Sequence, residues 1–183
     1  NIITKKEGEI ELGKKAQEQS EKEKASEAQL IEDLRSEIDD NLLKTLDIRR
    51  SEIDDMKILL VEDDPFSRRL VKNVLKKKYE VIEAEDGKEA LLKYITHAPN
   101  VVFLDINLPD CNGMEILENL ISIDKKSYVV MLSANAFKDN ILLSVKKGAK
   151  GFVAKPFPRE KIFHYINSYE TENQNKEEGT NVG

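Results

Sequence analysis

The sequence predicts an α/β fold between residues 56 and 169, with a doubly wound parallel sheet of five strands flanked by five helices. Short apolar segments alternate there with longer segments whose apolar residues recur every three or four positions. This alternation is typical of strand–helix–strand crossovers between parallel strands. The apolar segments are nearly continuous, which indicates a sheet covered on both faces. Right-handed crossovers then give an open sheet whose ligands gather beyond the carboxyl ends of the strands.

Five segments are predicted to form the strands. Each is rich in β-branched or other large apolar residues and is bounded by polar residues, glycine or proline. In chain order they are Ile58–Val61, Tyr79–Ile82, Val101–Leu104, Val129–Leu132 and Phe152–Ala154.

Five amphipathic helices are predicted to follow these strands. Pro65 suits the first turn of a helix, and Asp86 with Gly87 opens the second. Gly148 is a stop signal for a helix over residues 136–147, and Pro158 begins the last helix. The four predicted helices other than the one over residues 136–147 have apolar residues that are expected to face the sheet. They are Leu70, Val71, Val74, Leu75, Ala90, Leu91, Ile95, Met114, Ile116, Leu117, Leu120, Ile121, Ile162, Phe163 and Ile166.

The two ends of the chain differ from this central domain. The 183 residues include 29 Lys or Arg and 35 Asp or Glu, and the acidic excess falls in residues 1–55 and 170–183. Residues 1–55 are expected to be a charged extension, partly helical and partly disordered. Within it, apolar residues at three- and four-residue spacing predict a helix over residues 30–48 that self-associates or docks on a partner. Residues 170–183 are expected to be a disordered polar tail.

Composition argues against several functions. No basic stripe interleaves with aromatic residues, so direct nucleic-acid binding is not expected. The single cysteine, Cys111, excludes an intramolecular disulfide and a cysteine-based zinc site. No apolar run approaches about 18 residues, and no signal peptide is recognisable, so the expected location is the cytoplasm without membrane contact.

Polar residues follow four of the five predicted strands. Since the carboxyl ends of parallel strands share one edge of the sheet, these side chains are expected to lie together. Crowded carboxylates require a neutralising cation, and oxygen ligands of this kind favour Mg²⁺. A carboxylate can also act as a nucleophile and form an aspartyl phosphate. The residues concerned are Glu62, Asp63, Asp64, Asp105, Ser133 and Lys155.

Four segments resemble the signature blocks of the response-regulator receiver domain of two-component signalling, in the family's order and spacing. They are KILLVEDD (57–64), VVFLDINLPDCNGMEIL (101–117), VVMLSAN (129–135) and GAKGFVAKPF (148–157). The resemblance implies a flavodoxin-like receiver fold for residues 56–169. It also implies that the domain accepts a phosphoryl group from a histidine kinase or a histidine phosphotransfer protein. The domain is then not expected to be an enzyme, since it catalyses only its own phosphorylation and dephosphorylation.

The resemblance further implies the metal-binding residues. Asp105 is the expected phosphoacceptor and, with Asp63, a direct Mg²⁺ ligand. Asn107 is expected to offer its backbone carbonyl, while Glu62 acts on the metal mostly through water. Glu62 stands where the family more often has Asp.

Three residues are implied to bind the phosphoryl group and to switch. Ser133 and Lys155 are expected to bind the phosphoryl oxygens, and Phe152 to be the aromatic rotor, a position where Tyr is also frequent. Their movement would change the surface formed by the helix over 136–147, the fifth strand and the last helix. The Lys155–Pro156 peptide is expected to be cis. Neighbouring positions assigned to the site are Asp64, Ala134 and Pro156.

Two alternatives to a stand-alone receiver stay open. The chain can be the receiver part of a hybrid sensor kinase or larger regulator, acting as a phosphorelay intermediate with residues 1–55 as a linker. That linker contains no histidine, so it cannot carry a phosphohistidine itself. A haloacid-dehalogenase-like phosphatase also uses an aspartyl nucleophile, but that class places it at the first strand and has another Asp two residues later. Two residues after Asp63 this chain has Pro65. The downstream partner is not indicated.

Overall fold

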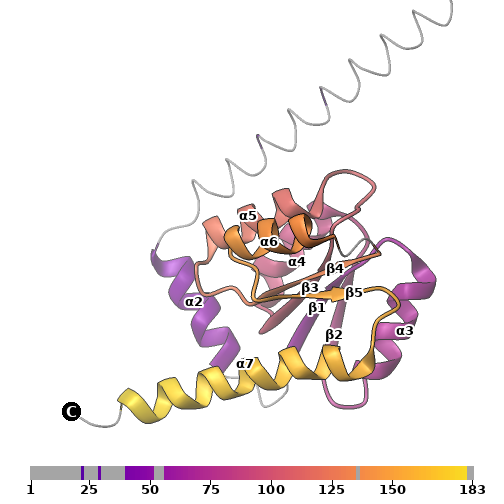
Figure 1. The fold of residues 1–183 in the computed structure, drawn as a ribbon. Coiled ribbons are helices and arrows are strands. Elements are labelled where there is room, and N and C mark those ends of the chain that lie inside the picture. The colour runs from indigo at the N-terminus through magenta and orange to yellow at the C-terminus, as the bar shows by residue number, and fades with distance from the viewer. Residues whose placement is uncertain (1–21, 23–28, 30–39, 52–55, 135–136, 181–183) are drawn as a thin grey trace, which may run out of the picture. The chain divides into compact units, whose positions relative to one another are not determined.

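A five-stranded parallel sheet with the order β2-β1-β3-β4-β5 forms the centre of the fold (Figure 1). The computed structural model describes residues 22, 29, 40–51, 56–134 and 137–180. The predicted fold class is confirmed, and every strand lies within two residues of its predicted bounds. The strands are β1 (Lys57–Val61), β2 (Glu80–Ala84), β3 (Val101–Asp105), β4 (Val129–Ser133) and β5 (Gly151–Ala154).

Burial along each strand follows its place in the sheet. β3 and β4 lie in the interior of the sheet and are buried at every residue, as their continuous apolar sequences predict. β2 is an edge strand, and its outward residues, beginning with Glu80, are more exposed. Asp105 therefore ends one of the two strands that are buried along their whole length.

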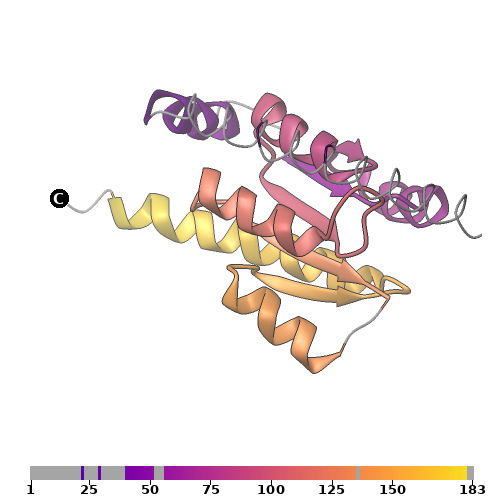
Figure 2. The same cartoon turned by 90° about the horizontal axis from the view of Figure 1, so that it is seen from above.

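Helices cover both faces of the sheet. α3 and α7 lie on one face, and α4, α5 and α6 lie on the other (Figures 1 and 2). Side chains of α3 and α7 such as Val71 and Ile162 pack against Ile58 and Phe103 of the sheet in one apolar core. The helices are α2 (Asp40–Ser51), α3 (Pro65–Leu75), α4 (Gly87–His97), α5 (Gly113–Ile123), α6 (Lys138–Lys146) and α7 (Arg159–Thr180).

Three helices begin at the carboxyl edge of the sheet with a side-chain cap. Asp64 accepts a hydrogen bond from the Ser67 N–H at the start of α3, and Asp86 does the same for α4. Asn112 caps α5 by accepting from the Met114 N–H. Each cap satisfies a backbone donor that the first helical turn leaves free, so the loops at this edge end at defined residues.

The amino-terminal helix α2 belongs to the same compact unit as the sheet. The sequence placed it in an extension outside the central domain and left its apolar stripe without a surface to cover. Instead, Leu46 is fully buried, and the Arg50 side chain is only 10% exposed. The helix over residues 30–48 was predicted correctly for its second half, whereas residues 30–39 lie outside the described residues.

The last helix is longer than the sequence suggested. Residues 170–180 continue α7, where a disordered tail was expected. Glu, Gln and Lys in this segment are good helix formers, and extending a helix that is already packed avoids the unfavourable nucleation step. The expectation was wrong because a polar composition argues against a core but does not argue against helix.

Candidate functional site

Three carboxylates meet at the carboxyl edge of the sheet. β1 leads into Glu62 and Asp63, and Asp105 is the last residue of the neighbouring β3. One oxygen from each carboxylate lies within 4.8 Å of the other two. Glu62 is fully buried and Asp105 is 2% exposed, whereas Asp63 is exposed to solvent. Closely spaced carboxylate oxygens that are open to water on one side fit a hard divalent cation such as Mg²⁺.

Lys155, which follows β5, supplies positive charge to this cluster. Its Nζ donates to Asp105 Oδ2 at 2.6 Å and to Glu62 Oε1 at 2.8 Å. Burial disfavours the ammonium, but the hydrogen bonds to the two acids outweigh it and raise the pKa of Lys155 above its usual value. The Lys155–Pro156 peptide is cis, which confirms the expectation from the resemblance.

Glu62 is the acid whose charge is least well stabilised. Burial, with a smaller contribution from the Asp105 carboxylate, raises the pKa of Glu62 to about 7, although Lys155 opposes this. One lysine does not compensate for two buried carboxylates and a third at the surface. A further positive charge beside the cluster would therefore be electrostatically favourable.

The other predicted site residues lie around this cluster. Ser133 is the last residue of β4, next to β3, and it is buried, while Ala134 follows it and is exposed. Asn107 lies two residues beyond Asp105, and its N–H points to Asp105 Oδ1 at 3.3 Å. Phe152 lies on β5 further from the edge and is half-buried.

Asp64 differs from its two acidic neighbours in what its carboxylate does. It accepts the Ser67 N–H at 2.7 Å, and the hydrogen bonds of this cap lower the pKa of Asp64. Its own N–H points to Glu62 Oε1 at 3.3 Å. The carboxylate of Asp64 thus holds the start of α3, while Glu62 and Asp63 form the cluster with Asp105.

Two residues of the loop after β3 shape the site and were not identified from the sequence. A Cβ atom on Gly113 would lie 2.0 Å from the carbonyl oxygen of Asp105, so only glycine allows α5 to begin this close. The Asn-Gly pair before an apolar helical pattern was a usable signal for this turn. Asp110 accepts hydrogen bonds from the N–H groups of Gly87 and Lys88 and so ties the loop to the start of α4. A loop aspartate carries no such signal in the sequence.

Arg68 of α3 is a third residue that sequence reasoning missed. Its guanidinium donates to the backbone carbonyls of Glu62 and Asp63, the two acids that β1 contributes. Two adjacent arginines on an amphipathic helix normally indicate a solvated face, so nothing in the sequence distinguishes Arg68 from its neighbour.

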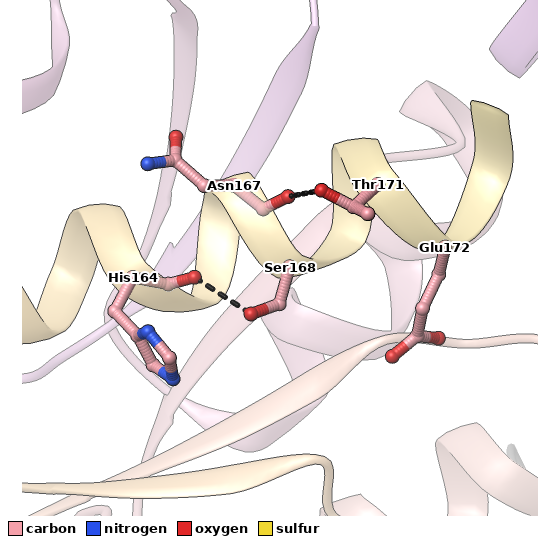
Figure 3. A pocket seen from close by; sticks show the side chains of 5 residues that line it. All are labelled: His164, Asn167, Ser168, Thr171 and Glu172. Atoms are coloured by element: carbon pink, nitrogen blue, oxygen red, sulfur yellow. Dashed lines mark hydrogen bonds between the residues drawn. The ribbon is translucent and has the colours of Figure 1, made fainter. Parts of the chain in front are cut away.

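Two of the surface hollows that described residues line lie away from the acidic cluster. One follows the outer side of α7, where the Ser168 and Thr171 hydroxyls donate to carbonyls of their own helix (Figure 3). The other lies between α2 and α7, and its charged groups pair largely with one another, as Lys126 does with Asp47. Neither hollow gathers polar groups toward a common point, so the carboxyl edge is the candidate site.

The arrangement at the carboxyl edge suits phosphoryl transfer. A carboxylate such as Asp105 can attack phosphorus, and a lysine beside it can neutralise the phosphoryl oxygens. A divalent cation bound by the acids would provide the remaining positive charge. None of the helices in the described part of the chain has the length and apolar composition needed to cross a membrane.

Comparison with known proteins agrees with this geometry. The sequence model of the response regulator receiver domain matches residues 58–167. The chemotaxis protein CheY of Listeria monocytogenes is 38% identical over 113 residues, which are 61% of this chain and 95% of that protein. CheY of Bacillus subtilis is 35% identical over 113 residues, covering 61% and 94% of the two chains.

Solved structures show the same fold. A CheY-like receiver domain from Methanospirillum hungatei has a TM-score of 0.61 and 29% identity, with 67% of this chain and 98% of that chain covered. CheY in a CheX–CheY–BeF3–Mg complex from Borrelia burgdorferi has a TM-score of 0.59 and 32% identity, covering 62% and 87%. With this fold, acid cluster and family match, the chain belongs to the response regulator receiver family and contains a CheY-like receiver domain.

Proposed function

We propose that Asp105 is the phosphoacceptor of a two-component phosphorelay. The observation that carries the proposal is the position of its carboxylate, at the end of β3, 2.6 Å from Lys155 Nζ and within a cluster of two further acids. The low exposure of Asp105 limits competing water, while the exposed Asp63 beside it leaves a path for a donor. The chain belongs to the response regulator receiver family, which supports this role.

The acid cluster is proposed to hold Mg²⁺. Asp63, Asp105 and the backbone carbonyl of Asn107 would be its direct ligands, and Glu62 would act through water. When bound, the ion supplies charge that offsets the developing negative charge on the phosphoryl oxygens. The raised pKa of Glu62 and the excess of carboxylates over cations support this assignment. The Borrelia burgdorferi CheY complex, solved with Mg, supports it further.

The proposed transfer is a displacement at phosphorus. An Asp105 carboxylate oxygen forms a bond to the phosphorus of a phosphohistidine while the phosphorus–nitrogen bond breaks. The electron pair of that bond stays with the imidazole, which takes up a proton, and Asp105 becomes an acyl phosphate. Ser133 and Lys155 are proposed to bind the phosphoryl oxygens. Water later cleaves the acyl phosphate, so the domain turns over only its own phosphoryl group.

The signal is proposed to leave through the surface of α6, β5 and α7. A phosphoryl group on Asp105 gives the Ser133 hydroxyl a new acceptor, which draws in the loop after β4 and leaves space for the Phe152 ring to turn inward. This surface already exposes a row of apolar side chains that a downstream protein could cover. They are Phe137, Leu142, Leu143 and Val145.

The receiver itself is proposed to span residues 56–169, with α2 as an added element packed on it. Its donor would be a histidine kinase or a histidine phosphotransfer protein. A receiver within a hybrid kinase would use the same site and the same donor chemistry. Self-association through the amino-terminal helix stays a prediction, since Leu46 already lies within the unit of its own chain.

Phosphorylation with a small donor tests the proposal. The full chain is incubated with acetyl phosphate and Mg²⁺, and its intact mass is compared with that of Asp105→Asn. The parent is expected to gain one phosphoryl group, and the variant is expected to gain none. Equal incorporation in the two proteins would rule out Asp105 as the acceptor. Omission of Mg²⁺, with excess chelator, should suppress the gain and serves as the control for the metal.

A further inference from the structure

Arg68 is the cation that holds the backbone of the acidic cluster. It lies in the first half of α3, and its side chain is 12% exposed. Its Nη1 donates to the carbonyl oxygen of Glu62 at 2.7 Å and to that of Asp63 at 3.2 Å. One guanidinium group therefore holds the two successive peptide units from which both β1 acids project.

The guanidinium is held in turn by acids of β2 and the loop that follows. Arg68 Nη2 donates to Glu85 Oε1 at 2.6 Å, and Nε lies 3.5 Å from Glu83 Oε2. The planar, forked group of arginine can make these contacts at once, which a lysine cannot. Arg68 thereby joins the loop after β1 to the end of β2, beside the backbone bond from the Glu62 N–H to the Ala84 carbonyl.

The Arg68 contacts hold the loop after β1 in place against the repulsion among the clustered carboxylates. Glu62, Asp63 and Asp105 carry like charges that repel one another, and the loop between β1 and α3 is short. If the loop relaxes, the carboxylates move apart and the metal loses its preformed ligands. Groups that orient metal ligands without touching the metal typically contribute 10- to 100-fold in affinity.

We propose that Arg68 is a positioning residue for Mg²⁺, acting through the backbone of Glu62 and Asp63. The inference rests on the proposed function, because it takes the acidic cluster to be a Mg²⁺ site. Charge alone makes the opposite prediction: removing a cation near carboxylates should strengthen binding of a divalent cation. The direction of the change therefore separates positioning from simple electrostatics.

The test measures Mg²⁺ affinity of the full chain by titration calorimetry. Arg68→Ala is expected to weaken Mg²⁺ binding at least about tenfold. Arg68→Lys keeps the charge and can reach one carbonyl, so it should recover only part of the loss. The matched control is Arg69→Ala, since Arg69 is the next residue of α3, carries the same charge and is exposed. Its affinity should stay within about twofold of the parent.

A second variant covers the case in which Arg68→Ala does not fold. Arg68→Lys serves this purpose because it leaves the charge near the site unchanged: simple electrostatics predicts no change in Mg²⁺ affinity, whereas the loss of one carbonyl contact predicts weaker binding. Thermal melts in chelator establish that each variant is folded. Arg68→Ala or Arg68→Lys with unchanged or tighter Mg²⁺ binding overturns the positioning role and leaves the proposed function standing. A parent that binds no Mg²⁺ overturns both.

Discussion

At the carboxyl edge of the sheet three carboxylates cluster and two of them, Glu62 and Asp105, pair with the Lys155 ammonium, whereas at the amino edge one arginine faces one buried aspartate. There, Arg50 of α2 lies 2.7 Å from Asp124 Oδ2 and donates to the Tyr94 hydroxyl at 2.6 Å. The Tyr94 hydroxyl donates to the same Asp124 oxygen at 2.8 Å. The two edges thus bury charged groups with different degrees of pairing.

The buried carboxyl groups at the two edges respond in opposite directions. Burial by itself raises the pKa of a carboxyl group, but at Asp124 the attraction and hydrogen bond of Arg50 outweigh burial and lower the pKa. At Glu62 burial prevails, and the pKa rises to about 7. The amino edge is therefore completed by the chain's own residues, while the carboxyl edge lacks positive charge. This difference supports the proposal that a cation and a phosphoryl group bind at the carboxyl edge.

Two helices connect the edges. α4 and α5 begin beside the site, where Asp86 and Asn112 cap them, and they end near Tyr94 and Asp124. The paired network at their far ends fixes both helices to α2. We infer that stability and function are separated along the strands, with the fixed end supporting loops that must adapt at the other.

We call the amino edge, where Arg50 and Asp124 pair, the paired edge. Breaking this pair should give the largest loss of stability. Arg50→Ala leaves the Asp124 carboxylate buried beside Tyr94 without its counter-ion. Removing one partner of a buried ion pair typically costs about 3–5 kcal/mol. Urea unfolding at neutral pH should show a loss of this size in the free energy of unfolding.

Arg49→Ala is the matched control for the paired edge. Arg49 is exposed and donates a 3.3 Å hydrogen bond to the Thr96 carbonyl. Its removal should cost less than about 1 kcal/mol. Similar losses in Arg49→Ala and Arg50→Ala would mean that α2 as a whole, rather than the buried pair, stabilises this edge.

The carboxyl edge should gain stability when it binds a divalent cation. A ligand present at about 100 times its dissociation constant stabilises a folded protein by about 2.7 kcal/mol. Mg²⁺ should therefore raise the unfolding free energy of the parent by an amount of this order. Asp63→Asn should abolish the increase, yet be as stable as the parent or more stable in chelator, because it removes a like charge. A markedly lower melting temperature of Asp63→Asn in chelator would contradict this account of the cluster.

The two edges should also respond oppositely to pH. Because the pKa of Glu62 is raised from 4.5 to about 7 in the fold, its contribution to stability is fully present below about pH 4.5 and is lost as pH rises through about 7. The pKa of Asp124 is lowered, so its contribution is present above its unfolded value and is lost as pH falls through the lowered one. Unfolding in chelator between pH 5 and 8 should show stability falling with pH, by at most about 1.4 kcal/mol per unit. Glu62→Gln should remove this slope, and an unchanged slope would assign it to another group.

The order and type of the elements could be predicted from the sequence because they depend on local patterns. Continuous apolar segments such as Val101–Leu104 and caps such as Asp86 are recognisable without any tertiary contact. The ends of the chain were harder. Residues 170–180 extend a helix nucleated by packing elsewhere, and α2 is held by Arg50, whose partner lies 74 positions away at Asp124.

At the site, too, residues that follow from local patterns could be predicted, whereas those that depend on contacts between distant residues could not. The acids that end β1 and β3 converge because parallel strands share an edge, which spacing alone can indicate. Arg68 acts by donating to two carbonyl oxygens, and backbone carbonyls occur at every residue. The need for glycine at position 113 arises from the approach of α5 to Asp105, a distance that no local pattern specifies.

The smallest effect is expected where phosphorylation should change nothing. Beryllofluoride with Mg²⁺, a mimic of the phosphoryl group, should shift NMR signals from Asp105 through Ser133 to Phe152 and the surface of α6, β5 and α7. Signals of Tyr94 and Arg50 should hardly move, because a fully paired buried network has no alternative partner to take. Ser133→Ala should shorten the spread by removing the hydroxyl that follows the phosphoryl group. Large shifts at Tyr94 would show that the paired edge takes part in the switch and that α2 receives the signal directly. Shifts confined to the loops around Asp105 would show instead that the site binds phosphate without moving the α6 surface.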